Sequence, residues 1–168
     1  MNRRLASAAF VSAMMLAGCG LQQDLSQVPI GNGPTGPATP ITAPTVTGTP
    51  YEWSTTHGHV VVLDFWGSWC SPCNQEQPTL DTLAREWIPK GVIFLGVDIQ
   101  DTDPNAIAYE RAYNVPYTSV NDASEVITSE YNVLDPPTVV IVDAKGNIVD
   151  RFLGTLAGVA NDLTRLTS

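Results

Sequence analysis

The chain has 168 residues, 43% of them hydrophobic, with a formal net charge of -9 and three cysteines. This length and composition predict a single domain with one apolar core. The excess of acidic residues excludes nucleic acid as a partner and opposes binding to anionic lipid headgroups. Any attachment to a membrane must therefore come from a hydrophobic anchor.

The N-terminus predicts a lipoprotein signal peptide over residues 1–18. Arg3 and Arg4 precede an apolar stretch at residues 5–16, and small residues then lead to Cys19. This order is typical of secretory signals, and the tetrapeptide that ends at Cys19 resembles a bacterial lipobox. We therefore expect cleavage before Cys19 and a diacylglycerol group on its sulfur. A membrane-spanning anchor is the alternative, but about a dozen apolar residues are too few for the ~20 that cross a bilayer.

The composition changes over residues 19–50, which we interpret as the lipidated cysteine and a linker. Prolines and glycines interrupt every potential helix there: Pro29, Gly31, Gly33, Pro34, Gly36, Pro37, Pro40, Pro44, Gly48 and Pro50. Such a composition is typical of flexible linkers. The predicted folded domain is therefore residues 51–168, tethered to the membrane but free to reorient.

Two cysteines separated by two residues, Cys70 and Cys73, lie where a predicted strand gives way to a predicted helix. The β-branched and aromatic run at residues 60–66 predicts a buried strand, and a single apolar stripe predicts a helix over residues 72–88. The unpaired N–H groups and the dipole at a helix start favour a thiolate at Cys70, which we expect to be the nucleophile. Cys73, one turn further on, is then the buried resolving thiol.

A redox-active disulfide explains this pair better than the alternatives do. A zinc site normally needs a second cysteine pair or added histidines, and the chain has no second pair. His57 and His59 precede the strand and supply only two donors, so we expect them to be loop residues. We predict no metal and no cofactor. The remaining possibility is that both cysteines are inert core residues.

The rest of the chain alternates between predicted strands and helices. The strand that follows the first helix makes a strand, helix, strand unit, which gives parallel pairing and places the cysteines at the carboxyl end of the first strand. The further predicted elements are an edge strand at 51–53, a strand at 92–98, a helix at 104–113, a short strand at 117–120, a short helix at 123–131, hairpin strands at 138–143 and 148–153, and a helix at 156–166.

Residues 59–154 resemble the extracytoplasmic thioredoxin-like proteins of the TlpA/ResA family. The matching segments are 61–73, which contains the two cysteines, and then 76–78, 91–97, 137–143 and 146–149, in that order. The resemblance implies an α/β fold: a thioredoxin-like three-layer sandwich whose central mixed sheet is flanked by helices. It also implies a central insertion, which fits the enlarged stretch at about 98–133.

Two acidic residues are candidate catalytic groups. Asp64 interrupts an apolar strand, and the resemblance places it at the buried acid of thioredoxin, where it would act through water as the base for Cys73. The alternative is a strand-end aspartate that faces solvent. Glu76 matches an acid of the ResA branch, but it could equally be an exposed glutamate that only favours the helix dipole.

The resemblance also predicts a substrate-binding groove beside the dithiol, lined by Trp69, Pro72, Pro136 and Pro137. Pro137 aligns with the cis-proline that faces the two cysteines in thioredoxin-like proteins, and a trans turn proline is the alternative. Pro136 departs from the family because it has no N–H to donate to a bound peptide.

The leading hypothesis is a lipid-anchored thiol:disulfide oxidoreductase outside the cytoplasm that reduces disulfides of exported proteins. Acidic groups near the dithiol oppose thiolate formation and so favour a reducing couple. The resemblance implies a membrane electron donor of the CcdA or DsbD type and apocytochrome c as a substrate. The alternatives are an oxidase that inserts disulfides into secreted proteins and a non-catalytic lipoprotein that binds peptides.

Overall fold

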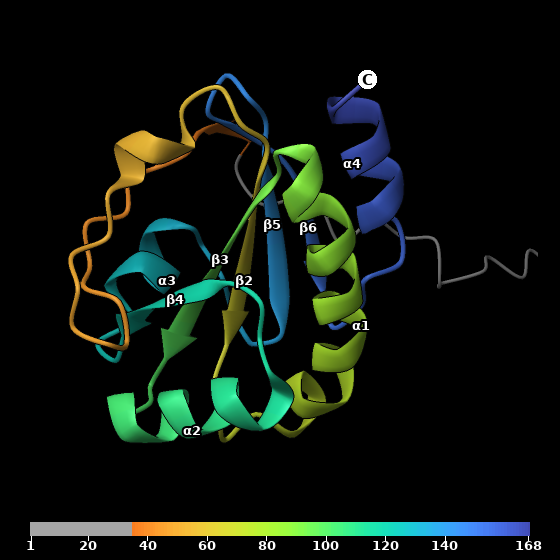
Figure 1. Ribbon diagram of the computed structural model, residues 1–168. Helices are drawn as coiled ribbons and strands as arrows, with labels where there is room; N and C mark the ends of the chain where they lie inside the picture. The colour runs from red at the N-terminus through yellow and green to blue at the C-terminus, as the bar shows by residue number, and fades with distance from the viewer. Residues whose placement is uncertain (1–34) are drawn as a thin grey trace, which may run out of the picture.

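A mixed sheet forms the centre of the computed structural model, which describes residues 35–168 (Figure 1). The strand order is β1-β6-β5-β2-β3-β4. The elements in chain order are β1 (Gly36–Pro37), the 3-10 helix η2 (Trp53–Thr56), β2 (Val61–Trp66), α1 (Ser71–Trp87), the 3-10 helix η3 (Ile88–Lys90), β3 (Ile93–Ile99), α2 (Asp103–Tyr113), β4 (Thr118–Asp122), α3 (Val126–Glu130), β5 (Thr138–Val142), β6 (Asn147–Leu153) and α4 (Val159–Leu166).

The central strands are buried on both sides, which is why β2 and β5 are continuous apolar runs with a single charged residue. β2, β3 and β4 are parallel, whereas β5 runs antiparallel to β2 and pairs with β6 in a hairpin. The carboxyl ends of β2 and β3 and the start of β5 therefore meet at one edge of the sheet.

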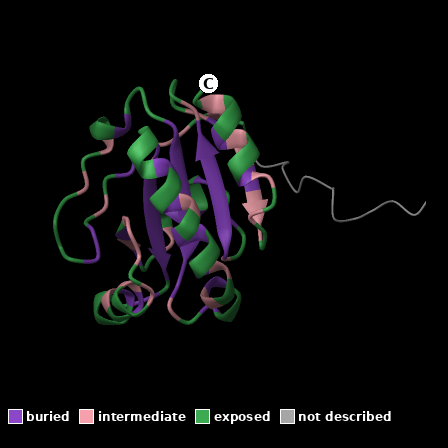
Figure 2. Ribbon diagram, turned by 45° about the vertical axis from the view of Figure 1, so that its right-hand side comes forward, coloured by how far each residue is buried: buried purple, intermediate pink, exposed green. Residues whose placement is uncertain are grey.

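Helices cover the two faces unequally. α1 and α4 pack on one face through apolar side chains such as Leu80 and Leu163, and α2 crosses the end of the same face at the foot of Figure 1. α3 and the N-terminal segment cover the other face, where Ile127, Tyr131 and Ile41 join the core. The sheet is consequently the most buried layer (Figure 2). The predicted three-layer α/β sandwich is confirmed.

The N-terminal boundary of the domain lies earlier than the sequence predicted. Residues 35–50 do not form a free linker, because β1 pairs with β6, and Ile41 and Val46 are buried. The hydroxyl of Tyr131 donates a hydrogen bond to the carbonyl of Thr39 at 2.7 Å. Prolines and glycines exclude a helix here, but they still allow an extended strap across the sheet.

The other corrections are small. The edge strand predicted at residues 51–53 is wrong, because Trp53 begins the 3-10 helix η2. The helix predicted at 123–131 is shorter, and α4 starts three residues later than predicted. The predicted enlargement at 98–133 contains α2 and β4, which extends the sheet at its edge.

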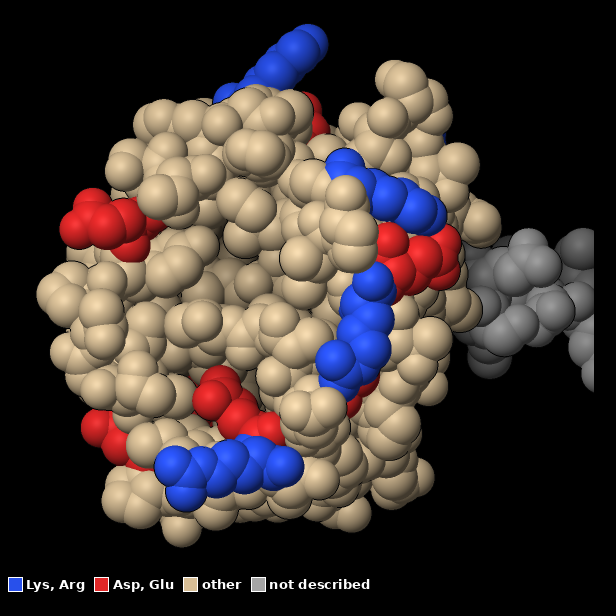
Figure 3. All heavy atoms as spheres, in the orientation of Figure 1, with Lys and Arg blue, Asp and Glu red and all other residues tan. Residues whose placement is uncertain are grey.

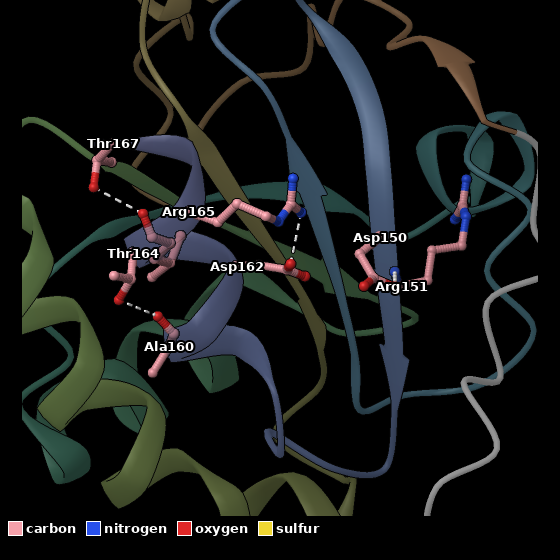
Figure 4. A network of polar contacts seen from close by, with 8 residues as sticks. Asp150, Arg151, Ala160, Asp162, Thr164, Arg165 and Thr167 are labelled. Atoms are coloured by element: carbon pink, nitrogen blue, oxygen red, sulfur yellow. Dashed lines mark hydrogen bonds and ion pairs between the residues drawn. The ribbon is translucent and has the colours of Figure 1, made fainter.

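The surface around α1 and α4 carries few charges, and several lie in pairs. Figure 3 shows basic side chains next to acidic ones on this side of the molecule. Arg165 lies 2.6 Å from Asp162, and Lys90 lies 2.8 Å from Glu86. Side-chain hydroxyls of Thr164 and Thr167 bond to α4 carbonyls (Figure 4). The two exposed ion pairs each contribute at most about 1 kcal/mol to stability.

Within residues 35–168, no helix is long and apolar enough to cross a bilayer.

Candidate redox site

The candidate site lies at the sheet edge where β2 ends and β5 begins. Phe65 pairs with Thr138, so the residue before β5, Pro137, is level with the end of β2. Leu153, at the end of β6, also pairs with Thr138, and the N–H of Gly154 bonds to the carbonyl of Pro137 at 2.9 Å. Segments more than 60 residues apart in sequence therefore meet beside the dithiol.

Cys70 and Cys73 form a disulfide at the start of α1, with Cα atoms 5.2 Å apart. Cys70 is the N-cap residue, and its sulfur accepts the backbone N–H of Cys73 at 3.1 Å. Both residues are 3% exposed. In the reduced protein the same N–H and the helix dipole would stabilise a thiolate on Cys70. This geometry suits the predicted division into a nucleophilic and a resolving thiol.

The loop before the dithiol is held from the end of β3. The carboxylate of Asp101 accepts the N–H of Ser68 at 2.8 Å, and the indole N–H of Trp69 donates to the carbonyl of Ile99 at 3.0 Å. Gly67 has no room for a side chain, because a Cβ there would lie 2.6 Å from the Trp69 indole nitrogen. Trp69 remains 51% exposed and provides an apolar surface next to Cys70.

Asp64 is buried rather than turned to solvent, which excludes the surface alternative. It lies on the same strand face as Trp66, which packs with both cysteines. The hydroxyl of Tyr117 donates to its carboxylate at 2.9 Å. Burial raises the pKa of Asp64 to about 7, the hydrogen bond from Tyr117 lowers it, and the negative charges of Glu76 and Asp81 raise it. Asp64 can therefore exchange a proton near neutral pH.

Glu76 lines an open groove of about 330 Å³ between α1 and the segment after β6. The groove also includes Pro72, Thr79, Gly154 and Leu156. Partial burial raises the pKa of Glu76. The structure thus places Glu76 beside the dithiol loop rather than on the far side of the helix.

The bond between Pro136 and Pro137 is cis, as the resemblance implied. Pro137 is buried and Pro136 is half-buried. Leu134, just before them, is 86% exposed. Pro136 has no N–H, so a peptide bound along this segment could use only its carbonyl.

The remaining residues that the sequence singled out are Cys19 and two histidines. Cys19 lies outside the described residues. His57 and His59 are exposed, and Nδ1 of His59 hydrogen-bonds the carbonyl of Gly91 at 2.8 Å. Across residues 35–168, no group of three or more histidine, cysteine or acidic side chains could hold a metal ion.

Sequence reasoning missed three residues that support the site: Asp101, Tyr117 and Gln77. Asp101 had a usable signal, because it follows the strand parallel to β2 and must lie at the same sheet edge. Tyr117 and Gln77 are 40 residues apart, and no local pattern joined them to Asp64.

A mixed sheet with a dithiol at a helix start and a facing cis-proline defines a thioredoxin-like domain. The AhpC/TSA family profile matches residues 34–151, and the chain belongs to that family. Curated relatives include the thiol-disulfide oxidoreductase ResA of Bacillus thuringiensis, 31% identical over 97 residues that cover 58% of this chain and 56% of the relative. The chain thus spans little more than half of that relative. The thioredoxin-like protein YneN of Bacillus subtilis is 27% identical, with 93% of this chain and 92% of the relative covered.

Solved structures show the same fold. A secreted Mycobacterium tuberculosis disulfide oxidoreductase, described as homologous to E. coli DsbE, matches with a TM-score of 0.68 at 28% identity, over 76% of this chain and 96% of the other. A thioredoxin family protein from Chlorobium tepidum matches with a TM-score of 0.72 at 22% identity, over 82% of this chain and 99% of the other. Together with the ResA relatives, these matches support the resemblance to the TlpA/ResA proteins.

Proposed function

We propose that this protein is a thiol:disulfide oxidoreductase that acts outside the cytoplasm and reduces disulfides of exported proteins. The observation that carries the proposal is the Cys70–Cys73 disulfide at the start of α1, level with the cis-proline Pro137. Membership of the AhpC/TSA family and the names of the ResA relatives support it.

In the proposed reaction, the Cys70 thiolate attacks a substrate disulfide and forms a mixed disulfide with one substrate sulfur, and the other sulfur leaves as a thiolate. The Cys73 thiol gives its proton through water to Asp64 and attacks the sulfur of Cys70. The bond from Cys70 to the substrate breaks, so the substrate gains two electrons and Cys70 and Cys73 become joined. A membrane donor of the CcdA or DsbD type would restore the dithiol.

The reducing direction rests on the charges beside the dithiol. Asp64 and Glu76 add negative charge near the sulfurs, which opposes a thiolate, and strong oxidants owe their potential to a stabilised reduced form. Equilibration of residues 35–168 with glutathione buffers tests this. We expect a potential closer to thioredoxin, about -270 mV, than to DsbA, about -120 mV. A value near DsbA would instead support an oxidase, the direction that the sequence left as an alternative.

The location rests on the N-terminal sequence and on one relative. We propose that residues 1–18 are removed, that Cys19 carries lipid and that the mature domain is anchored outside the cytoplasm to the bacterial cell membrane. A matched structure is described as secreted, which supports an extracytoplasmic site. Cys19→Ala should release the protein from the membrane fraction without change in dithiol reactivity, and its retention there would contradict a lipid anchor.

Reduction of insulin disulfides compares activity directly. Cys70→Ser should abolish turnover, whereas equal rates in parent and variant would leave only a peptide-binding role. Cys73→Ser should accumulate mixed disulfides between Cys70 and exported proteins, because the resolving step is lost. Among the trapped proteins, apocytochrome c would support the substrate that the family resemblance implies.

A further inference from the structure

A chain of buried and partly buried polar side chains lies on the α1 face of the sheet. The Tyr117 hydroxyl donates to Asp64 at 2.9 Å, and Nε2 of Gln77 donates to that hydroxyl at 2.9 Å. The same nitrogen donates to Asp81 at 2.8 Å, and the Tyr109 hydroxyl donates to Oε1 of Gln77 at 3.2 Å. We call these five residues the Asp64 cluster.

The Asp64 cluster lies directly behind the dithiol. Gln77 is one helical turn after Cys73 on the buried stripe of α1. Asp64 is two residues before Trp66, which packs with both cysteines, and two residues after Val62, which packs with the apolar half of α1. The cluster thus lies between the apolar group that contains the cysteines and the apolar group that packs against α1 and α4. A buried polar group at this position must be either satisfied or functional.

The hydrogen bonds of the cluster fix one orientation for each member. A phenol has a single hydrogen, and because the Tyr117 oxygen accepts from Gln77, that hydrogen is left to be donated to Asp64. Both amide hydrogens of Gln77 are used, and its oxygen accepts from Tyr109. Reversing the amide would place its oxygen against the Asp81 carboxylate and would allow Tyr117 to donate to that oxygen instead of to Asp64. Gln77 therefore determines the direction in which Tyr117 donates.

We propose that Tyr117, oriented by Gln77, is a positioning residue that holds Asp64 as the proton acceptor for Cys73. This rests on the proposed function, in which Asp64 takes the proton of the resolving thiol before Cys73 attacks Cys70. Tyr117 contacts neither sulfur in this role and acts only through Asp64.

The groups that face Asp64 explain why it needs this donor. Glu76 and Asp81 on α1 oppose its ionisation, as does burial, and Tyr117 is the hydrogen bond that favours the charged form. Tyr109 on α2 reaches the cluster through Gln77. Burial raises the pKa of Tyr117 well above its usual value, so its hydroxyl stays protonated and remains a donor across the working pH range.

Tyr117→Phe tests the proposal through a pH profile. The reduced protein reacts with oxidised glutathione in a single turnover, and release of the second glutathione reports the attack by Cys73. Without the phenol, ionisation of Asp64 should require a higher pH, because a hydrogen bond to a charged group is lost. We expect the midpoint of the profile to rise by about one pH unit and the rate at pH 6.5 to fall about tenfold, with recovery at pH 9. The carboxyl ¹³C shift of Asp64 should titrate with the same displacement.

Three variants complete the test. Gln77→Met should shift the midpoint in the same direction by less, and it replaces Tyr117→Phe if that variant does not fold. Tyr113→Phe removes a phenol outside the cluster and should keep the parent profile. Asp64→Asn should abolish the rise in rate with pH that the ionisation of Asp64 produces, which we call the limb of the profile. Adding Tyr117→Phe to this variant should change nothing further.

The outcomes separate two failures. If Asp64→Asn abolishes the limb but Tyr117→Phe and Gln77→Met keep the parent midpoint, the positioning role is wrong and the proposed function stands. If Asp64→Asn itself keeps the parent profile, Asp64 is not the acceptor and both ideas about the cluster fall, although Cys70 and Cys73 can still exchange disulfides.

Discussion

Two buried aspartates lie on neighbouring strands of this protein and on the same face of the sheet, but their surroundings differ. Asp64 on β2 pairs with Gly96 on β3, and Asp98 lies two residues further along β3, opposite Trp66. Asp64 accepts a hydrogen bond from Tyr117. Neither carboxylate oxygen of Asp98 has a hydrogen-bond partner among residues 35–168.

Because of this difference, the two aspartates have different pKa values and different protonation states near neutral pH. Burial raises the pKa of Asp64 to about 7, with a donor that opposes the rise. Burial raises the pKa of Asp98 to about 8, and the negative charges of Asp101 and Glu110 add to it. Asp64 is thus poised to exchange a proton near neutral pH, whereas Asp98 is held mainly as the neutral acid at pH 7.

Gly96→Ala should have the largest effect on stability, because Gly96 lies beside Asp64 and two residues before Asp98, where the packing leaves no room for a side chain. The indole of Trp66 donates to the hydroxyl of Ser119 at 3.2 Å, and a Cβ at Gly96 would clash with that hydroxyl and lie 2.7 Å from the indole nitrogen. Overpacking and loss of this buried bond should lower the free energy of unfolding by about 4 kcal/mol in urea titrations. Thr118→Val on the exposed part of β4 is the control, with a change within about 0.5 kcal/mol.

Asp98→Asn should stabilise the protein, and more so at high pH. The folded protein keeps Asp98 protonated up to about pH 8, whereas the unfolded chain releases the proton near its ordinary pKa of 3.8. The contribution of protonated Asp98 to the free energy of unfolding is therefore fully present below pH 4 and is lost as the pH rises to about 8. We expect the variant to gain about 3 kcal/mol at pH 9 and little at pH 4, measured by urea unfolding. An equal gain from the exposed Asp135→Asn would mean that net charge, not burial, is responsible.

Asp64→Asn should stabilise less, by about 2 kcal/mol at pH 9, because Tyr117 already compensates part of the buried charge. Its gain should level off near pH 7 rather than pH 8, since the pKa of Asp64 in the folded protein is about 7. Urea unfolding from pH 4 to pH 9 measures both curves. A larger gain at Asp64 than at Asp98 would mean that the buried charge is more costly at Asp64, despite its hydrogen bond from Tyr117.

The features that could be predicted from the sequence are those with a signal in neighbouring residues. The apolar run of β2 and the stripe of α1 place Cys70 and Cys73 correctly, because both patterns are local. The composition of residues 35–50 predicts a linker, but the segment is part of the domain, because Ile41 and Val46 are buried through pairing with strands at least 70 residues later. The composition of this segment indicates that it forms no helix, but it does not indicate that the segment pairs with a distant strand.

The polar contacts behind the site needed the structure for a related reason. The family resemblance points to Asp64, whereas Asp98 interrupts its apolar strand just as clearly but has no such resemblance to mark it. Which of the two is hydrogen-bonded depends on Tyr117, which lies 53 residues from Asp64. A single sequence contains no signal for such a contact.

Glu110→Gln should have the smallest effect and tests why the pKa of Asp98 is so high. The Glu110 carboxylate raises the pKa of Asp98, and burial also raises the pKa of Glu110 itself. Removing its charge should stabilise the protein by about 1 kcal/mol at pH 9, by urea unfolding, while the exposed Glu130→Gln changes nothing measurable. The gain has two sources, which a double-mutant cycle separates. In the Asp98→Asn background the part due to repulsion of Asp98 should vanish, whereas an unchanged gain would mean that the two carboxyl groups titrate independently and that Glu110 has no part in raising the pKa of Asp98.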